Sequence, residues 1–271
     1  MRSLLSRRAA LALPLWRNSL AAAPVPRWRA AEIRRFAAPE ARQAVAAGQG
    51  HLYAIDNHAI AKYEKTGGKR LALYECEQGK PFIHLNSGIV RDNLLHCAHS
   101  NYPAVPMLSS IETWDTGALR HVGSHSCGIE AGSATWVEFH QGFRYVTFAH
   151  YANRAAEPNR DPRWTALLQF DHEWRRLQGW AYPAELVSKL GQYSISGGVF
   201  HPSGVMLCTG HDNPEIYVLG FPAGGSTLVL HDTIAAPIQG QGIALDPTDP
   251  AIVYAIDRAA REIIVLRLAE A

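Results

Sequence analysis

Tyr53-Ala54-Ile55-Asp56-Asn57 joins a short apolar run to a small residue and a polar turn, and this pattern returns along the chain. Self-similarity at a period of about 40 to 50 residues is typical of β-propellers. The pattern therefore predicts five structural repeats. The other four copies are Cys97-Ala98-His99-Ser100-Asn101, Phe148-Ala149-His150-Tyr151, Thr209-Gly210-His211-Asp212-Asn213 and Tyr254-Ala255-Ile256-Asp257-Arg258.

Each copy lies between two further strand-like runs. A run of alternating character follows it, such as Ile216–Leu219, so that the two runs form a predicted hairpin. A short run of small residues precedes it, such as Gln241–Ala244, which suits strands crowded around an axis. We therefore predict an all-β fold, a five-bladed β-propeller. A two-sheet sandwich gives no reason for the fivefold recurrence.

The two ends of the repeat region complement each other. Phe36-Ala37-Ala38-Pro39, ahead of the first repeat, echoes Ile234-Ala235-Ala236-Pro237 ahead of the last, and the chain stops after the third strand of repeat five. A strand over residues 31–37 would supply the missing outer strand and close the ring without unpaired edges. Residues 31–271 are thus predicted to be a single propeller, preceded by a targeting segment over residues 1–30.

The N-terminal segment has the pattern of a targeting signal. Residues 1–31 hold six Arg and no acidic residue, with a basic start, an apolar stretch over residues 9–16 and small residues at 21–23. The apolar stretch is too short to span a bilayer. Ser6-Arg7-Arg8 resembles a twin-arginine export signal, and a mitochondrial presequence is the alternative. We predict export to the bacterial periplasm and no membrane segment in the mature chain.

The remaining chain carries 20 basic against 24 acidic residues. Without clustered cations it lacks the electrostatic footprint of a nucleic-acid-binding protein. We expect a small-molecule substrate and a monomer. The four cysteines are expected to be free thiols, because their places in the repeat separate them by more than a disulfide spans, and Cys97 and Cys208 are expected in the core.

Three histidines occupy one column of the repeat in consecutive blades: His99, His150 and His211. Three imidazoles with an open coordination position suit Zn or another first-row divalent metal that activates water or a substrate oxygen. We predict these three as metal ligands. Two other interpretations stay open: a substrate-binding role without a metal, and histidines that only satisfy buried backbone groups.

Loops that enter the innermost strands and loops between second and third strands open on one face of a propeller. The first set carries His84, predicted as a fourth ligand or an acid–base group. Asp212, beside His211, is predicted as a catalytic base. Long loops over residues 101–110 and 151–164 could wall a pocket, although a tolerated surface insertion is the alternative. The predicted substrate-binding residues are Asn86, Asn101, Tyr102, Tyr151, Arg154, Ser196 and Gln241.

Four stretches carry a resemblance to a known group of proteins: Ile83-His84-Leu85-Asn86-Ser87-Gly88, Ala98-His99-Ser100-Asn101-Tyr102-Pro103, Ser110-Ile111-Glu112-Thr113-Trp114-Asp115 and Thr209-Gly210-His211-Asp212. Together they resemble exported bacterial β-propeller proteins that are often labelled cycloisomerase-like. The resemblance covers most of residues 31–268 and implies the fold and export. The label itself is similar to that of propeller enzymes that lactonise muconates.

We expect a metal-dependent lyase, isomerase or lactonase that acts on a small oxygenated compound at the central face of the propeller. The alternative is a non-catalytic propeller that binds a protein or glycan partner through the long loops of blades two and three. In that case Tyr102, Tyr151 and Trp164 should be aromatic anchors on an exposed rim.

Overall fold

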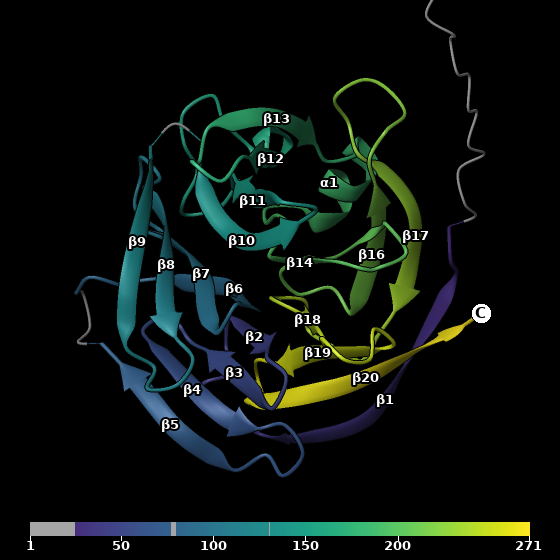
Figure 1. Cartoon of the computed structure of the whole chain (residues 1–271). Helices are drawn as coiled ribbons and strands as arrows, with labels where there is room; N and C mark the ends of the chain where they lie inside the picture. The colour runs from purple at the N-terminus through teal and green to yellow at the C-terminus, as the bar shows by residue number, and fades with distance from the viewer. Residues whose placement is uncertain (1–24, 77–79, 130) are drawn as a thin grey trace, which may run out of the picture.

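Five four-stranded antiparallel sheets surround a central axis in the computed structural model, which describes residues 25–76, 80–129 and 131–271 (Figure 1). The prediction of a five-bladed β-propeller is confirmed. Blades I and II comprise β2 (Ala44–Ala47), β3 (His51–Ile55), β4 (Ala59–Glu64) and β5 (Arg70–Glu75), then β6 (Leu85–Arg91), β7 (Leu94–Ser100), β8 (Ser109–Asp115) and β9 (His121–Gly128). Blade III comprises β10 (Ser133–His140), β11 (Phe143–Ala149), β12 (Ala166–Phe170) and β13 (Arg176–Ala181).

The last two blades complete the ring. Blade IV comprises β14 (Gly197–Phe200), β15 (Met206–Thr209), β16 (Glu215–Gly220) and β17 (Val229–Ala235). Blade V comprises β18 (Ala244–Leu245), β19 (Ile252–Asp257), β20 (Glu262–Glu270) and, as its outer strand, β1 (Trp28–Ala37).

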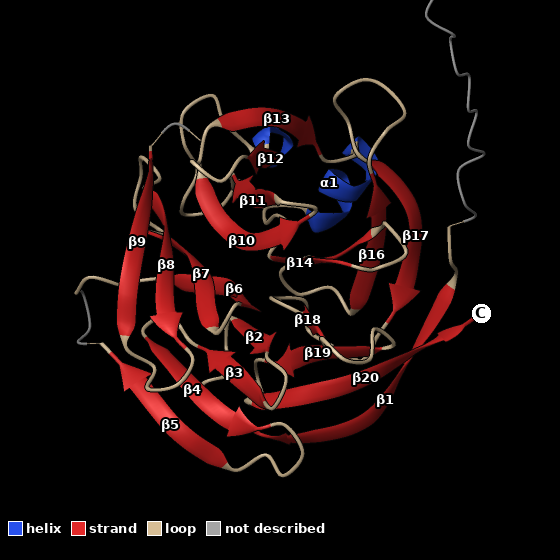
Figure 2. Ribbon diagram, viewed as in Figure 1, coloured by secondary structure: helices blue, strands red, loops and turns tan. Residues whose placement is uncertain are grey.

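The ring closes between the two ends of the described chain. β1 runs antiparallel to β20, from Trp28 opposite Glu270 to Ala37 opposite Glu262, and the two strands lie side by side in Figure 2. The predicted closure is confirmed. β1 begins at Trp28, three residues before the strand expected at residues 31–37. Residues 1–24, which carry most of the predicted targeting signal, lie outside the described residues.

Small residues let the inner strands approach the axis. A Cβ atom on Gly242 would overlap the side chains of Ala44 and Ser87, which belong to neighbouring blades. A Cβ atom on Gly198 would overlap the ring of Trp136, which is fully buried between blades III and IV. Glycine is therefore required where two blades meet this closely.

Apolar side chains fill the space between neighbouring blades. For example, Ala46 and Tyr53 of blade I share one buried cluster with Leu95 and Trp114 of blade II. Cys97 and Cys208 are fully buried, and all four cysteines are free thiols. This confirms the expectation for the cysteines, and it means that the core is held by packing between sheets.

The connections between second and third strands differ in length, as predicted. They are short in blades I, IV and V and long in blade II, over residues 101–108, and in blade III, over residues 150–165. The helix α1 (Ala184–Leu190) was not predicted. Its apolar face packs beside Trp136, and its C-terminal end leads into residues 192–196. No described helix is long and apolar enough to cross a membrane.

Candidate active site

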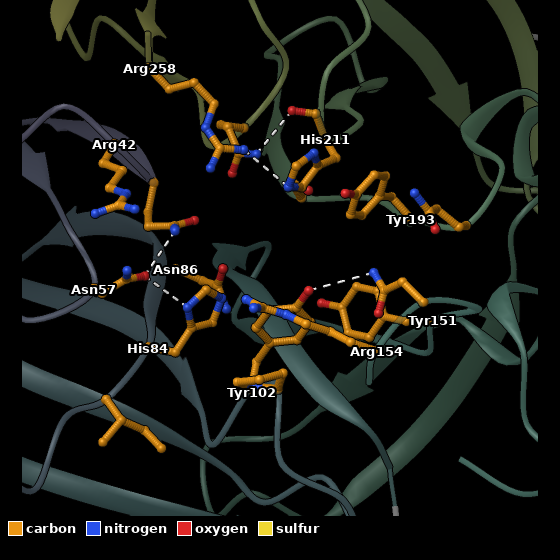
Figure 3. Close-up of a pocket in the computed structure, with 17 residues that line it drawn as sticks. Arg42, Asn57, His84, Asn86, Tyr102, Tyr151, Arg154, Tyr193, His211 and Arg258 are labelled. Atoms are coloured by element: carbon orange, nitrogen blue, oxygen red, sulfur yellow. Dashed lines mark hydrogen bonds between the residues drawn. The ribbon is translucent and has the colours of Figure 1, made fainter. Parts of the chain in front are cut away.

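A cavity of about 580 Å³ opens at the face where the loops before the inner strands meet the loops after the second strands (Figure 3). All five blades contribute to its wall, so the prediction that these two loop sets converge is confirmed. The lining residues are Arg42, Gln43, Asn57, Ile83, His84, Asn86, Tyr102, Pro103, Tyr151, Asn153, Arg154, Gln192, Tyr193, Ser196, His211, Gln241 and Arg258.

Most of the predicted site residues come together at this cavity. His84 and His211 lie on it, and both long loops wall it. The cavity therefore joins His84, a predicted acid–base group, and His211, a predicted metal ligand, to a set of polar and aromatic side chains. The predicted substrate-binding residues that line it are Asn86, Tyr102, Tyr151, Arg154, Ser196 and Gln241.

His84 presents one ring nitrogen to a protein partner. Its Nδ1 lies 2.8 Å from Asn57 Oδ1, which also accepts a hydrogen bond of 2.9 Å from Gln43 Nε2. Because an amide oxygen only accepts, Nδ1 carries the proton and Nε2 keeps its lone pair. No hydrogen-bond partner for this Nε2 occurs among the described residues, so the lone pair is available to a molecule in the cavity.

The surroundings keep His84 neutral. Burial lowers the pKa of its imidazole to about 3, and the nearby charges of His99, His211 and Arg154 act in the same direction. The ring also packs against Tyr102, with ring centroids 4.9 Å apart. At neutral pH His84 is therefore uncharged, and its Nε2 carries no proton.

His211 is held from three sides. Its ring stacks on Tyr193 with centroids 3.8 Å apart and an interplanar angle of 3°. Arg258 donates a hydrogen bond of 3.0 Å from NH1 to His211 Nε2, so Nδ1 carries the proton. Asp212 Oδ2 lies 2.7 Å from Nδ1, which is an ion-pair distance. The angles of this contact do not meet hydrogen-bond geometry. Burial lowers the pKa of His211, and Asp212 opposes this shift.

Three arginines give the cavity a positive wall. Arg42 and Arg258 lie on one side of it and Arg154 on another (Figure 3). The nearest ion-pair oxygens, on Asp56 and Asp212, are 4.0 Å from Arg42 and 3.8 Å from Arg258. Arg154 lies over the ring of Tyr102, 5.5 Å from its centroid. No Asp or Glu is among the described residues that line the cavity, so the site favours an anionic or oxygen-rich ligand.

The three predicted metal ligands are not brought together. His99 is the last residue but one of β7, His150 follows the end of β11, and His211 lies two residues past β15. Their aligned positions in the sequence therefore differ in where they lie relative to the strand ends. Within the described ranges, no group of three or more His, Cys, Asp or Glu side chains is arranged to hold a metal ion.

His99 braces the segment that carries His84. Its Nε2 accepts a hydrogen bond of 3.3 Å from the backbone N–H of Ile83, and its Nδ1 therefore donates to Ser110 Oγ at 3.0 Å. Both ring nitrogens are occupied, and His99 does not line the cavity. The geometry assigns it a structural contact next to the site.

His150 braces the two long loops. Its Nδ1 lies 2.9 Å from Glu157 Oε2 and its Nε2 lies 3.2 Å from the carbonyl oxygen of Ala131. Glu157 also accepts a hydrogen bond of 3.2 Å from the backbone N–H of Met107, in the loop of blade II. The side chain of His150 is only 3% exposed, so this contact is a buried brace.

We expect a His150→Ala variant to lose about 2 kcal/mol of folding free energy, because Glu157 is left without its buried partner. Chemical denaturation measures the loss. A His172→Ala variant is the matched control, because the side chain of His172 is 80% exposed and its replacement should have no measurable effect. Equal stability of the two variants would contradict the brace.

Two other predicted residues stand outside the cavity lining. The side chain of Asn101 donates to the carbonyl oxygen of Pro106 at 3.0 Å and accepts from the N–H of Leu108 at 2.8 Å, so it shapes its own loop. The side chain of Asp212 is 61% exposed and does not line the cavity. Asp212 therefore contacts the site through His211 and Arg258.

The sequence analysis missed several lining residues. Asn57 and Arg258 both lie two residues beyond the column that contains the histidines, so this second column was a usable signal. Arg42 precedes the first inner strand, and the residues predicted at the equivalent places of other blades are histidine or uncharged. Tyr193 follows α1, a helix that the strand pattern did not reveal.

Comparisons with known proteins agree on the fold. The solved structures that resemble this chain include a glutaminyl cyclase from Myxococcus xanthus, with a TM-score of 0.61, 14% identity, and coverage of 91% of this chain and 99% of that one. A luciferin-regenerating enzyme gives a TM-score of 0.52 and 10% identity over 89% of this chain and 95% of that one. No protein-family model and no curated protein matches the chain. At such low identities the similarity establishes only a shared propeller architecture.

Proposed function

We propose that the chain is an enzyme of the lyase, isomerase or lactonase type that acts on a small oxygenated compound in the central cavity. The observation that supports this most is the unpartnered Nε2 of His84, a neutral proton acceptor that faces a cavity with a positive wall. A general base must present its lone pair to the substrate while another group fixes its tautomer, and Asn57 provides that orientation. His84 therefore takes the proton in this proposal.

The cavity fits a small molecule. Its volume of about 580 Å³ lies within the range of ligand pockets in proteins. The arginines would hold a carboxylate, lactone or other oxygen-rich group. Asn86 would orient the compound, since its Nδ2 donates to the carbonyl oxygen of Ala134 at 3.0 Å, whereas no described residue forms a hydrogen bond with its Oδ1. The propeller neighbours include enzymes, which supports the use of this architecture for catalysis.

The metal ion and the periplasmic location stay predictions. No step of the proposal depends on a metal, because the residues that would have bound it contact other partners. Metal analysis of the purified chain, beside a variant that lacks His99, His150 and His211, tests the metal. Detection of the mature chain in a periplasmic fraction tests the location.

The alternative of a non-catalytic binding protein has less structural support. It required Tyr102, Tyr151 and Trp164 on an exposed rim, but Tyr151 is buried and Tyr102 is half-buried in the cavity wall. Trp164 alone is exposed, at 58%. Two of the three proposed anchors, Tyr102 and Tyr151, thus line the cavity and do not form an exposed rim.

A screen in heavy water tests the proposal. Lactones, hydroxy acids and unsaturated acids are incubated with the protein and followed by proton NMR, which detects ring opening, rearrangement and the exchange of carbon-bound protons. We expect turnover or exchange with one of these classes, and none with a Ser196→Trp variant, whose new side chain would fill the cavity. Compounds that bind in the cavity without any turnover would contradict the enzyme and favour the binding protein.

A further inference from the structure

Arg258 forms a hydrogen bond with His211 that an anionic ligand can replace. The NH1 group of Arg258 donates to the neutral His211 Nε2 at 3.0 Å, while the only carboxylate near this guanidinium among the described residues is Asp212, 3.8 Å away. A guanidinium forms stronger, two-pronged hydrogen bonds with a carboxylate than with a neutral imidazole. His211 is therefore a weaker partner for Arg258 than an anionic ligand would be.

His211 would stay in place if Arg258 turned away from it. Its ring lies flat on Tyr193, and its Nδ1 remains 2.7 Å from Asp212 Oδ2. Its carbonyl oxygen accepts a hydrogen bond of 2.9 Å from Gln241 Nε2. These three contacts do not involve Arg258. The release of Arg258 would therefore uncover Nε2 without moving the imidazole.

The rest of the cavity favours an anion at this point. Arg42 lies on the same side of the cavity as Arg258, and the described lining contributes no acidic side chain that would repel a carboxylate (Figure 3). The side chain of Arg258 is 25% exposed, so that it can be reached from the cavity and still has a defined position. Charge and access thus agree with the exchange of partners.

We propose that a carboxylate of the ligand binds Arg258 in place of His211. Ligand binding thereby uncovers His211 Nε2 as a second group that can donate or accept a proton, across the cavity from His84. The first half concerns binding alone. The second half rests on the proposed function, because only an enzyme would use the uncovered nitrogen. An empty cavity would then have one available imidazole and an occupied cavity two.

The test compares carboxylates with amides of the same shape. Succinate and succinamide, and glutarate and glutaramide, are titrated into the protein by NMR or calorimetry. We expect the dicarboxylates to bind wild type and an Arg258→Gln variant to bind them roughly 10- to 100-fold more weakly, with Arg258→Lys between the two. Arg120→Gln is the matched control, since the Arg120 side chain is 79% exposed outside the cavity, and it should bind as wild type does.

A second readout follows His211 itself. Long-range proton–nitrogen spectra should show its Nε2 signal moving when succinate is added to wild type, and already displaced in Arg258→Gln without ligand. Thermal unfolding checks that this variant is folded; if it is not, Arg258→Lys and the wild-type spectra decide.

The outcomes separate the two proposals. Succinate that binds no more tightly than succinamide, or binding that Arg258→Gln leaves unchanged, overturns this inference. A His211 signal that does not move on binding also overturns it. If binding and the His211 signal behave as expected but no compound is ever turned over, the proposed catalysis fails while the exchange of partners stands.

Discussion

Replacement of His84 by Gln will slow turnover of the cavity's substrate by at least about 100-fold, because general-base catalysis typically contributes this much or more. Gln is similar in size and can keep a hydrogen bond to Asn57 Oδ1, but it has no nitrogen lone pair to accept a proton. The loss should therefore appear in kcat, with ligand affinity nearly unchanged. Steady-state kinetics on the substrate that the screen identifies, together with direct binding, measure both quantities.

The pH profile adds a readout that is specific to His84. Burial sets its pKa at about 3, so its lone pair is available throughout the physiological range. The acid limb of kcat/KM that comes from His84 should therefore lie far below the usual histidine range. His201→Gln is the matched control, since His201 contacts Ser203 outside the cavity and its replacement should leave kcat unchanged. Full activity in His84→Gln would exclude His84 as the base.

Acidification from pH 7 to 5 will lower the melting temperature by roughly 5 to 10 °C. The pKa values of His84 and His96 are lowered by burial to about 3 and about 4, and those of His99, His150 and His211 are also lowered. Below the ordinary histidine pKa of about 6.5, the unfolded chain binds protons that the folded chain does not. Each of the two strongly shifted histidines therefore costs about 2 kcal/mol of stability at pH 5.

Glu138 acts in the opposite direction. Burial raises the pKa of its carboxyl to about 7, so the stability that belongs to its protonated form is present below the unfolded value of 4.5 and is lost as the pH rises through 7. Acidification from pH 7 to 5 thus recovers about 2 kcal/mol at this position. A Glu138→Gln variant, which is neutral throughout, should show a steeper loss of melting temperature on acidification than wild type.

Calorimetry across this pH range decides the matter. The histidine contribution should be absent above about pH 7 and should grow steadily below about pH 6.5. A His96→Gln variant should show a shallower loss than wild type, opposite in sign to Glu138→Gln. A melting temperature that rises on acidification in wild type would contradict this assignment of the pH dependence to buried histidines.

The predictions that depended on the inner strands placed their residues at the cavity, and the role of these residues in substrate binding stays a prediction. Asn86, Ser196 and Gln241 were chosen because they begin inner strands, and all three line the cavity. Glycine and other small residues let the inner strands approach the axis closely. For these three residues, the position in the repeat therefore predicted correctly that the residue lies at the cavity.

The prediction that depended on the second strands did not place its histidines together. The second strands end at different points relative to these histidines, and the loops that follow the strands differ in length. His99 contacts Ser110, and His150 contacts Glu157. No local sequence pattern predicts either contact. Of the three histidines, only His211 reaches the cavity.

The sequence by itself determined the number of blades, the strand that closes the ring and the face on which a site would form. These features follow from the local alternation of apolar and polar residues and from the turns between them. Backbone hydrogen bonds then join these segments into regular sheets. The tertiary structure alone decided which side chains share the cavity, and it added Arg42, Asn57 and Arg258. Which side chains lie together in the cavity depends on ring closure, on the path of each loop and on the orientation of each side chain. A short stretch of sequence does not determine this combination.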